Sequence, residues 1–392
     1  MENLRAAVIG CGNIGSAHAS AIAQNKVHGL QLTAVCDLSA ERLKEAALYC
    51  PGRLLYTDYR KMLSDRVADV AVIATPHYEH SPIACDCFAA GLHVLSEKPG
   101  GVYTRQVEKM IRASEKSGRK FGVMFNQRTD PIFKTAADLL KSGKIGMVKR
   151  AVWMITNWYR TEHYYRSGGW RATWSGEGGG VLLNQAPHNL DLLVSLLGMP
   201  KSVWADCRVG AYHAIEVEDD ATLYLEYENG ATAVFITSTG EYPGTNRLEI
   251  SGSKGKMVLE NGQLRTELLD FDEPEYRQNS SEDFCSRPVI RKEIPLPPAV
   301  EGHLAILQNF ADAILRGEKL IAPGNEALWE LTVSNAAYLS SWLHQKIDLP
   351  IDAARFEQEL QKHIAAEKEE HREAGDSAGQ KGEYQSRWQP KW

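Results

Sequence analysis

The run Gly10-Cys11-Gly12-Asn13-Ile14-Gly15 joins a short apolar stretch, Leu4 to Ile9, to an alanine-rich stretch without proline, Ile14 to Gln24. The first stretch predicts a buried strand and the second predicts a helix. In a G-x-G-x-x-G turn the first glycine permits the tight turn, the second admits a pyrophosphate close to the backbone, and the third lets helix pack on strand. The residues predicted to bind a dinucleotide are therefore Gly10, Gly12, Asn13, Ile14 and Gly15.

A carboxylate follows the next predicted strand at the distance that a dinucleotide site requires. Leu32 to Cys36 is apolar, and Asp37 comes directly after it. A carboxylate there accepts hydrogen bonds from the adenosine ribose, and its charge repels the 2′-phosphate of NADP, so NAD is the expected cofactor. NADP is less favoured but stays open, because Arg42 is close enough in sequence to weaken that repulsion. The other alternative is a structural βα turn that binds no nucleotide, since glycine-rich turns are common.

The composition of the 392 residues excludes several classes of protein. The length exceeds what one hydrophobic core organises, so two domains are expected. A net charge of −6 without a basic run argues against nucleic acid as a partner. No apolar stretch is long enough to span a bilayer, and the early first strand leaves no room for a signal peptide. We therefore expect no membrane association.

The seven cysteines are an odd number and show no C-x-x-C spacing. Cys85 and Cys87 are close enough to suggest a metal or redox pair, but residues two apart on a helix point to different faces. We therefore expect reduced thiols, no metal site and a cytoplasmic location.

Up to about residue 125, short apolar runs alternate with helical patterns. Such alternation predicts right-handed βαβ units and an α/β Rossmann domain with a doubly wound parallel sheet. The predicted strands are Ala6 to Ile9, Leu32 to Cys36, Leu54 to Tyr56, Val70 to Ala74, Val94 to Leu95 and Phe121 to Phe125, and the helices between them include Ala40 to Tyr49, Glu79 to Ala90 and Thr104 to Ser117.

Beyond this point, strand follows strand. A helix over 130–142 precedes strand-like runs at 148–156, 203–209, 221–227, 231–238, 247–251 and 256–259, and helical patterns return at 301–316 and 325–344. This order predicts an α+β domain with a large, open, mainly antiparallel sheet. The predicted domains are an NAD-binding domain (1–126), a substrate-binding and oligomerisation domain (127–356), and a polar C-terminal helix and tail (357–392). Because the open face of the sheet needs a cover, we expect a homodimer or homotetramer.

Glu97, Lys98 and Pro99 close the strand that ends at Ser96. Ligands of doubly wound sheets bind beyond the carboxyl ends of the strands, so Lys98 is placed to present an ammonium to a substrate hydroxyl. The alternative is a surface salt bridge.

Three polar residues punctuate an apolar helical pattern that follows Gly178, Gly179 and Gly180. If the helix is underway by Asn184, then Asn184, His188 and Asp191 fall at i, i+4 and i+7 on one face. They predict a catalytic or substrate-binding face; the alternative is a buried hydrogen-bonded network.

The segment between 157 and 174, called the aromatic segment below, begins with Asn157 and concentrates aromatic and basic side chains, among them Tyr159, Trp170 and Arg171. Aromatic rings pack on the apolar face of a sugar, and Arg and Asn hydrogen-bond its hydroxyls, so these four are expected to bind substrate. The alternative is an arm that packs on a neighbouring subunit.

Together these motifs resemble the Gfo/Idh/MocA oxidoreductases, in order and over nearly the whole chain to about residue 350. The motifs are the fingerprint with His18, the segment from Ala74 to His80, the Glu97-Lys98-Pro99 triplet and the block from Gly178 to Asp191. The resemblance implies that Lys98 is the catalytic lysine and His188 the acid/base histidine. It also places Arg128 toward the cleft, and at the nicotinamide end of the cofactor it places Thr75, Pro76, His80 and Glu97.

Asn184 departs from the family, which commonly has an Asp at this position. An asparagine accepts and donates hydrogen bonds but takes up no proton. We therefore expect His188 to accept the proton and the Lys98 ammonium to stabilise the alkoxide. Asn184 is expected to orient these groups through its amide. Asp191 is expected either to bind substrate or to control the imidazole tautomer.

These inferences predict an NAD-dependent dehydrogenase that oxidises a secondary hydroxyl of a sugar, glycoside or cyclic polyol to a ketone. Two alternatives stay open: a redox-neutral glycosidase that retains its NAD, and a ligand-sensing regulator that has lost turnover. The presence of both Lys98 and His188 argues against the regulator.

Overall fold

The computed structural model describes residues 3–367 and confirms the predicted parallel sheet. Six strands lie in the order β3-β2-β1-β4-β5-β6, and all neighbours are parallel. Their bounds are β1 (Leu4–Ile9), β2 (Leu30–Cys36), β3 (Leu54–Tyr56), β4 (Val70–Ile73), β5 (His93–Ser96) and β6 (Phe121–Val123). The strand order reverses between β1 and β4, so the crevice that binds ligands in such sheets opens beyond the carboxyl ends of these two strands.

Five helices connect these strands: α1 (Asn13–Ala23), α2 (Ala40–Tyr49), α3 (Tyr59–Ser64), α4 (His77–Ala89) and α5 (Thr104–Ser117). The predicted bounds of α2 and α5 are correct, and α4 begins two residues earlier than predicted. The prediction missed α3, a helix of six residues whose N-terminus is capped by the Asp58 side chain, which accepts from the Arg60 N–H.

The second sheet has nine strands in the order β14-β13-β12-β11-β7-β10-β9-β8-β15. It is mainly antiparallel, as predicted, although β10 pairs with β7 in parallel. The prediction missed β13, β14 and β15. The bounds are β7 (Val148–Ile155), β8 (Ser202–Val209), β9 (Glu218–Glu226), β10 (Thr232–Ser238), β11 (Asn246–Gly252), β12 (Gly255–Glu260), β13 (Gln263–Leu268), β14 (Ile290–Ile294) and β15 (Ile347–Asp348).

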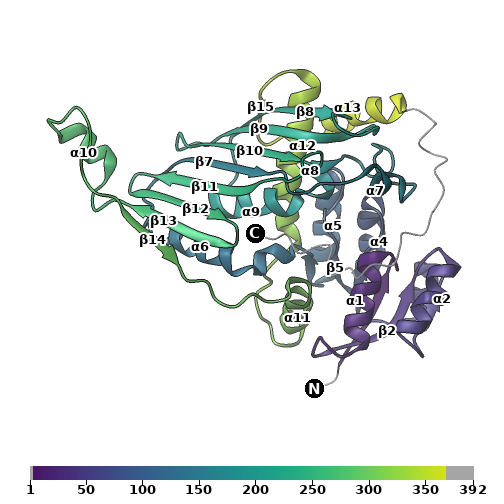
Figure 1. Ribbon diagram of the computed structural model, residues 1–392. Coiled ribbons are helices and arrows are strands. Elements are labelled where there is room, and N and C mark those ends of the chain that lie inside the picture. The colour runs from purple at the N-terminus through teal and green to yellow at the C-terminus, as the bar shows by residue number, and fades with distance from the viewer. Residues whose placement is uncertain (1–2, 368–392) are drawn as a thin grey trace.

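Helices gather on one face of this sheet, where Figure 1 shows α6, α9 and α12, while α10 projects from its far end. On the opposite face Trp204 and Tyr224 are cross-strand neighbours and are 49% and 41% exposed. The remaining helices are α6 (Pro131–Lys141), α7 (Glu162–Arg166), α8 (Val181–Asn184), α9 (Pro187–Leu197), α10 (Glu273–Asn279), α11 (Gly302–Leu315), α12 (Ala327–Leu343) and α13 (Ala353–Ala366), with short 3₁₀ turns η1 (Asn126–Thr129) and η2 (Gly324–Glu326).

A late segment of the chain returns to the first sheet and ties the two parts together. The Val123 N–H on edge strand β6 donates to the Ala322 carbonyl at 3.1 Å, and Gly122 forms a bridge with Pro323. The predicted boundary at residue 126 lies between β6 and β7, where parallel strands give way to the mixed sheet. The three-part division stays a prediction, and the predicted tail lies outside the described residues from 368 onward.

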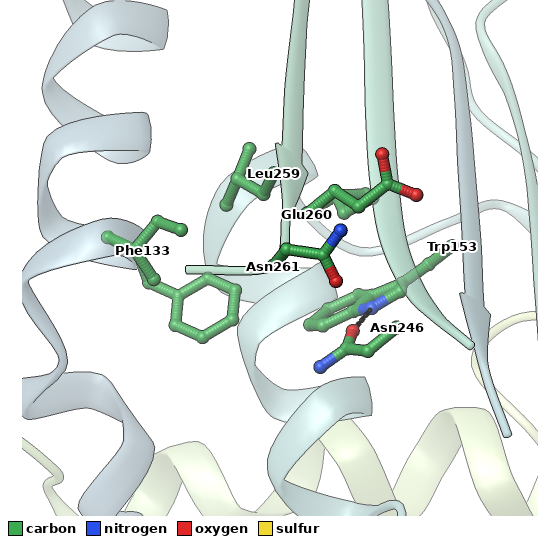
Figure 2. A pocket seen from close by; sticks show the side chains of 8 residues that line it. Phe133, Trp153, Asn246, Leu259, Glu260 and Asn261 are labelled. Atoms are coloured by element: carbon green, nitrogen blue, oxygen red, sulfur yellow. Dashed lines mark hydrogen bonds between the residues drawn. The ribbon is translucent and has the colours of Figure 1, made fainter. Parts of the chain in front are cut away.

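Figure 2 shows a small pocket between α6 and the second sheet. The Trp153 indole donates to Asn246 Oδ1 at 3.1 Å beside it, and Phe133 and Leu259 close its walls. Its volume of about 10 Å³ holds at most one water molecule. The pocket is a packing gap, and none of its lining residues belongs to the predicted site.

Between residues 3 and 367 no helix has the length and apolar character needed to cross a bilayer. All seven cysteines are free thiols, as expected.

The glycine turn yields a test that separates packing from cofactor access. A Cβ on Gly15 would lie 1.8 Å from the Gly10 carbonyl oxygen, whereas a Cβ on Gly12 would meet no atom within 4 Å. We expect Gly15→Ala to lower the free energy of unfolding by about 1–3 kcal/mol, because α1 must move off the turn. Gly12→Ala should change it by less than about 0.5 kcal/mol, yet weaken NAD binding about tenfold or more by occupying the space beside the pyrophosphate. Urea unfolding and NAD titration measure the two effects, and equal destabilisation by both substitutions would contradict this reading.

Candidate active site

The glycine turn closes tightly everywhere except at Gly12. Gly10 has a φ of +95°, and a Cβ there would lie 2.4 Å from the Ala74 carbonyl oxygen at the end of β4. Gly12 is the N-cap of α1, and it is the glycine of this turn with open space around it. The first N–H groups of the helix, including those of Asn13 and Ile14, lie next to this open space and have no partner within the helix. The turn therefore has the shape and the donors that a pyrophosphate needs.

Asp37 is fixed beside this turn by backbone donors. Its Oδ2 accepts from the Cys11 N–H at 2.7 Å, and its Oδ1 accepts from the Ser39 N–H at 2.8 Å. Each carboxylate oxygen keeps lone pairs for the ribose hydroxyls of a dinucleotide. The Arg42 guanidinium lies 3.9 Å from Asp37 Oδ2 and is half exposed. The fingerprint and its carboxylate thus fit NAD.

Glu97 is a buried carboxylate directly before Lys98, the predicted catalytic lysine. His18 Nε2 on α1 lies 2.7 Å from Glu97 Oε1, and the Lys98 N–H donates to Oε2 at 3.2 Å. Burial by itself raises the pKa of Glu97, but the hydrogen bond from His18 and the nearby His303 and Lys98 charges lower it to about 2. Glu97 is thus an anion that anchors the end of β5. The sequence marked His18 only as part of the fingerprint and assigned it no role.

His80 connects two loops at the carboxyl ends of β4 and β5. Its ring nitrogens each lie 2.8 Å from a backbone carbonyl oxygen, Nδ1 from that of Pro99 and Nε2 from that of Thr75, and the side chain is buried. His80 therefore holds the loops together, and its predicted contact with the cofactor stays a prediction. Thr75 Oγ1 is buried without a partner among the described residues, which fits a group that a bound nucleotide satisfies, and Pro76 is the N-cap of α4.

Lys98 reaches across from the first sheet to the second domain. Its ammonium donates to the Asn184 backbone carbonyl at 2.6 Å and lies 3.4 Å from Asn184 Oδ1. Burial lowers the pKa of Lys98 to about 8, an effect that Glu97 opposes and Arg171 reinforces. The structure thus brings Lys98 and Asn184 together, and the alternative of a surface salt bridge does not describe this lysine.

His188 lies near Lys98 as a neutral imidazole. Burial, reinforced by the Lys98 charge, holds the pKa of His188 well below its usual range. Its Nδ1 is buried and has no hydrogen-bond partner among the described residues, while the ring packs edge-on to Phe125 with centroids 6.3 Å apart. A neutral imidazole next to an ammonium is able to accept a proton.

The expected single helix through Asn184, His188 and Asp191 is wrong. Helix α8 ends at Asn184, and α9 begins at Pro187. Pro187 has no N–H to continue the first helix, and it occupies the first turn of the second, where that loss costs nothing. The break separates Asn184 from the other two residues and leaves its carbonyl at a helix end, where Lys98 binds it.

Asp191 faces Arg128, and both groups are used within the protein. Arg128 Nε donates to Asp191 Oδ2 at 2.7 Å, and Nη2 donates to Oδ1 at 2.5 Å. Arg128 also binds Glu326 on η2 and the Ile321 carbonyl at 3.0 Å. Burial raises the pKa of Asp191 to about 6, and Arg128 opposes the shift. Contact of Arg128 or Asp191 with a substrate stays a prediction; the pair joins η1 to α9 and η2.

The aromatic segment, residues 157–174, approaches Lys98 through Arg171. Its guanidinium lies 4.7 Å from the Tyr164 ring centroid and 4.6 Å from that of Trp170, and Nη1 donates to the Tyr164 hydroxyl at 2.8 Å. Trp170 packs edge-on to His77 at 5.1 Å. Tyr159, by contrast, packs against Tyr242.

Two family models match the chain, and together they cover both sheets. The model described as "Oxidoreductase family, NAD-binding Rossmann fold" matches residues 4–125, and the model of the "GFO/IDH/MocA C-terminal domain" matches residues 133–258. The chain belongs to the Gfo/Idh/MocA family. The cofactor of this Gfo/Idh/MocA protein is accordingly NAD.

Curated relatives and solved structures agree with this assignment. The chain is 26% identical over 330 residues to myo-inositol 2-dehydrogenase of Thermotoga maritima, a match that spans 79% of this chain and 95% of the relative. It is also 26% identical to inositol 2-dehydrogenase of Rhizobium meliloti, over 86% of this chain and 96% of the relative. Among solved structures, the WlbA dehydrogenase of Bordetella pertussis in complex with NADH and UDP-GlcNAcA superposes with a TM-score of 0.77 at 26% identity, over 90% of this chain and all of that one.

Sequence reasoning missed two buried carboxylates in this Gfo/Idh/MocA site. Glu177 accepts a hydrogen bond from the Asn184 amide, and Glu330 on α12 has no partner for either carboxyl oxygen among the described residues. Burial raises the pKa of Glu330 well above its usual range, and the Asp191 charge adds to the effect. Burial therefore favours the neutral form of Glu330. Glu177 precedes the glycines and Glu330 sits in a long apolar helix, so neither position carried a recognisable signal. Of the remaining predicted residues, Asn157 has a buried Oδ1 without a partner among the described residues.

The Arg128–Asp191 pair predicts a stability effect that distinguishes a structural role from substrate binding. Arg128→Met should lower the free energy of unfolding by about 3–5 kcal/mol, because it leaves the fully buried Asp191 carboxylate unpaired. The double variant Arg128→Met/Asp191→Leu should recover most of that loss, since no buried charge then lacks a partner. Urea unfolding measures both. An Arg128→Met protein of wild-type stability with a raised KM would instead show that Arg128 serves the substrate.

Proposed function

We propose that this Gfo/Idh/MocA oxidoreductase is an NAD-dependent dehydrogenase that oxidises a secondary hydroxyl of a sugar, glycoside or cyclic polyol to a ketone. The observation that carries the proposal is the placement of the Lys98 ammonium, held on the Asn184 carbonyl beside neutral His188 at the carboxyl end of the parallel sheet. The inositol dehydrogenases among the relatives support this class of substrate.

The chain's own residues supply the proton chemistry. When bound, NAD supplies the hydride acceptor. A neutral His188 accepts the proton of the substrate hydroxyl, and the Lys98 ammonium donates a hydrogen bond to the same oxygen as it becomes an alkoxide. Lys98 carries three N–H groups, and Asn184 engages two of them at most, through its carbonyl and amide oxygens. Glu97 anchors the backbone that carries Lys98.

The aromatic segment supplies a surface suited to a carbohydrate. Trp170, Tyr164 and Arg171 form a stack at the edge of the site, and such a stack offers an apolar face next to hydrogen-bond donors. Asn157 and Tyr159 are proposed to extend this surface. NAD is proposed over NADP because backbone donors fix the Asp37 carboxylate beside the glycine turn, where its charge disfavours a 2′-phosphate.

The exposed face of the second sheet supports a homodimer or homotetramer. Trp204, Tyr224, Val234 and Val152 form one cross-strand row on it. A broad sheet face that carries an apolar row is typical of an interface between subunits. Seven free thiols support a cytoplasmic location.

Absorbance of NADH tests the proposal directly. We expect NAD, and to a lesser extent NADP, to be reduced with one group from a panel of free sugars, glycosides, anhydrosugars and inositols. Lys98→Met should bind NAD normally and lose turnover, because the alkoxide is then unstabilised. Wild-type turnover in Lys98→Met would contradict the assignment of Lys98. If the protein binds NAD but no compound of the panel produces NADH, the redox-neutral glycosidase or the regulator would be favoured.

The pKa of Lys98 predicts how turnover and stability depend on pH. Its folded value of about 8 is below the ordinary 10.5, so the ammonium is present below pH 8 and is lost above it. We expect kcat for oxidation to fall as the pH rises through about 8, measured from about pH 6 to pH 10 at saturating NAD. Folding disfavours the charged form, so the free energy of unfolding of the wild type should rise between pH 8 and 10.5, and Lys98→Met should lack this rise. A rate that climbs throughout this range would make neutral Lys98 the base instead.

A further inference from the structure

Glu177 stands between the aromatic segment and the catalytic lysine. Its Oε2 accepts from the Ala172 N–H at 2.8 Å, and its Oε1 accepts from Asn184 Nδ2. Its backbone carbonyl lies 2.8 Å from His77 Nδ1 on α4. The side chain is 2% exposed. A single residue thus touches the substrate-facing segment, the partner of Lys98 and the first domain.

The surroundings of this carboxyl group consist of donors. The Ala172 N–H and the Asn184 amide donate to it, and the Arg171 guanidinium lies 3.8 Å from Oε1. A carboxylate accepts at both oxygens, so this environment suits the ionised form. Burial raises the pKa of Glu177, and the Arg171 charge opposes that rise.

Glu177 decides which way the Asn184 amide points. A carboxylate oxygen only accepts, so the amide nitrogen must face Glu177, where it also lies 3.3 Å from the Tyr164 hydroxyl. The amide oxygen is then turned toward the Lys98 ammonium, which only donates, at 3.4 Å. The donors and acceptors form one ordered chain from Glu177 through Asn184 to Lys98.

The same carboxylate fastens the aromatic segment. Ala172 adopts a left-handed conformation with a φ of +61°, which is uncommon for a residue with a Cβ. Its N–H is held on Glu177, and Arg171 next to it carries the stack with Tyr164 and Trp170.

We propose that Glu177 is a positioning residue that orients Asn184, and through it Lys98, while it holds the aromatic segment against the same lysine. The inference rests on the proposed dehydrogenase function for its kinetic consequences. Asn184 is an amide that takes up no proton. Under this inference the acidic group next to it is Glu177.

A neighbouring buried glutamate shows how a purely structural carboxylate is bound. Glu218 accepts from the backbone N–H groups of Gly180 and Leu182 and from the Tyr338 hydroxyl. Those partners shape the glycine turn before α8. Glu177 differs because one of its two hydrogen bonds goes to a side chain that contacts Lys98.

Several charged or titratable groups face Lys98 from the elements packed around it, and any test based on its titration must count them. They are Glu97 from the end of β5, Arg171 from the aromatic segment, Glu177 from the loop that follows it, Glu330 from α12, His77 and His80 from α4, and His188 from α9. Removing the negative charge of Glu177 withdraws one of the groups that favour the ammonium.

The test begins with Glu177→Gln, which keeps the shape and changes one acceptor into a donor. The introduced amide must accept from the Ala172 N–H, so its nitrogen meets the Asn184 nitrogen, and a flip of Asn184 only moves the clash to Lys98. We expect kcat for the substrate found in the panel to fall about tenfold or more, with a smaller change in KM. The inflection of the pH profile should move to lower pH.

Asn184→Asp supplies the discriminating partner. Alone, it sets two carboxylates against each other and should also reduce kcat. Combined with Glu177→Gln, it reverses the direction of the same hydrogen bond and restores an acceptor facing Lys98. We expect the double variant to return to within about threefold of wild type, a coupling that two independent losses would not produce. Glu162→Gln serves as the matched control and should behave as wild type. Glu162 lies on the aromatic segment, but its carboxylate accepts from the Ala214 N–H and does not contact Asn184 or Lys98.

A readout that needs no substrate separates this inference from the proposed function. Competitive labelling of Lys98 across a pH series, followed by mass spectrometry, reports its titration in the full chain. A shift to lower pH in Glu177→Gln, reversed in the double variant, supports the inference even if no sugar is oxidised. An unchanged Lys98 titration in folded Glu177→Gln, or a double variant no better than the worse single one, would overturn it. If Glu177→Gln does not fold, recovery of folding but not of the titration in the double variant would also overturn it.

Discussion

One hydrogen bond, from the Lys98 ammonium to the Asn184 carbonyl oxygen, spans the junction on which the site depends. Lys98 is carried by the carboxyl end of β5, and Asn184 by the last turn of α8. The carbonyl is available because the terminal carbonyls of a helix have no partner within it, and Pro187 prevents continuation. The loop after β5 therefore meets α8 at an ammonium whose position and protonation both depend on residues beyond the first sheet.

This arrangement concentrates ionisable groups in a buried place, and their order follows from what each one touches. The hydrogen bond from His18 favours the anion at Glu97, burial beside Lys98 favours the neutral imidazole of His188, and burial raises the pKa of Glu330. Burial alone would discharge them all, so the charges that survive are those with a partner. Burial of the apolar interiors of both sheets offsets the stability that such a cluster costs.

Much of this was predictable because it depends on local pattern. Apolar runs and helical periods locate β2, α2 and α5 within a residue or two, and GCGNIG with Asp37 marks the dinucleotide crevice. The prediction failed at Pro187, where an apolar pattern continued through a residue that ends the helix. It also missed β13, in which polar residues interrupt the apolar pattern, and β14, a mostly exposed strand at the edge of the sheet.

The sequence by itself determined the two classes of sheet and the dinucleotide fingerprint, since each rests on neighbours in the chain, and the catalytic roles of Lys98 and His188 stay predictions. Only the tertiary structure decided the partners: Asp191 with Arg128, His80 with two carbonyls, and Glu177 with Asn184. Some of these contacts join segments that are far apart in the chain. Others depend on how a loop orients its side chains. Residue type limits what a polar group is able to bind, but the packing of the two sheets determines which partner reaches it.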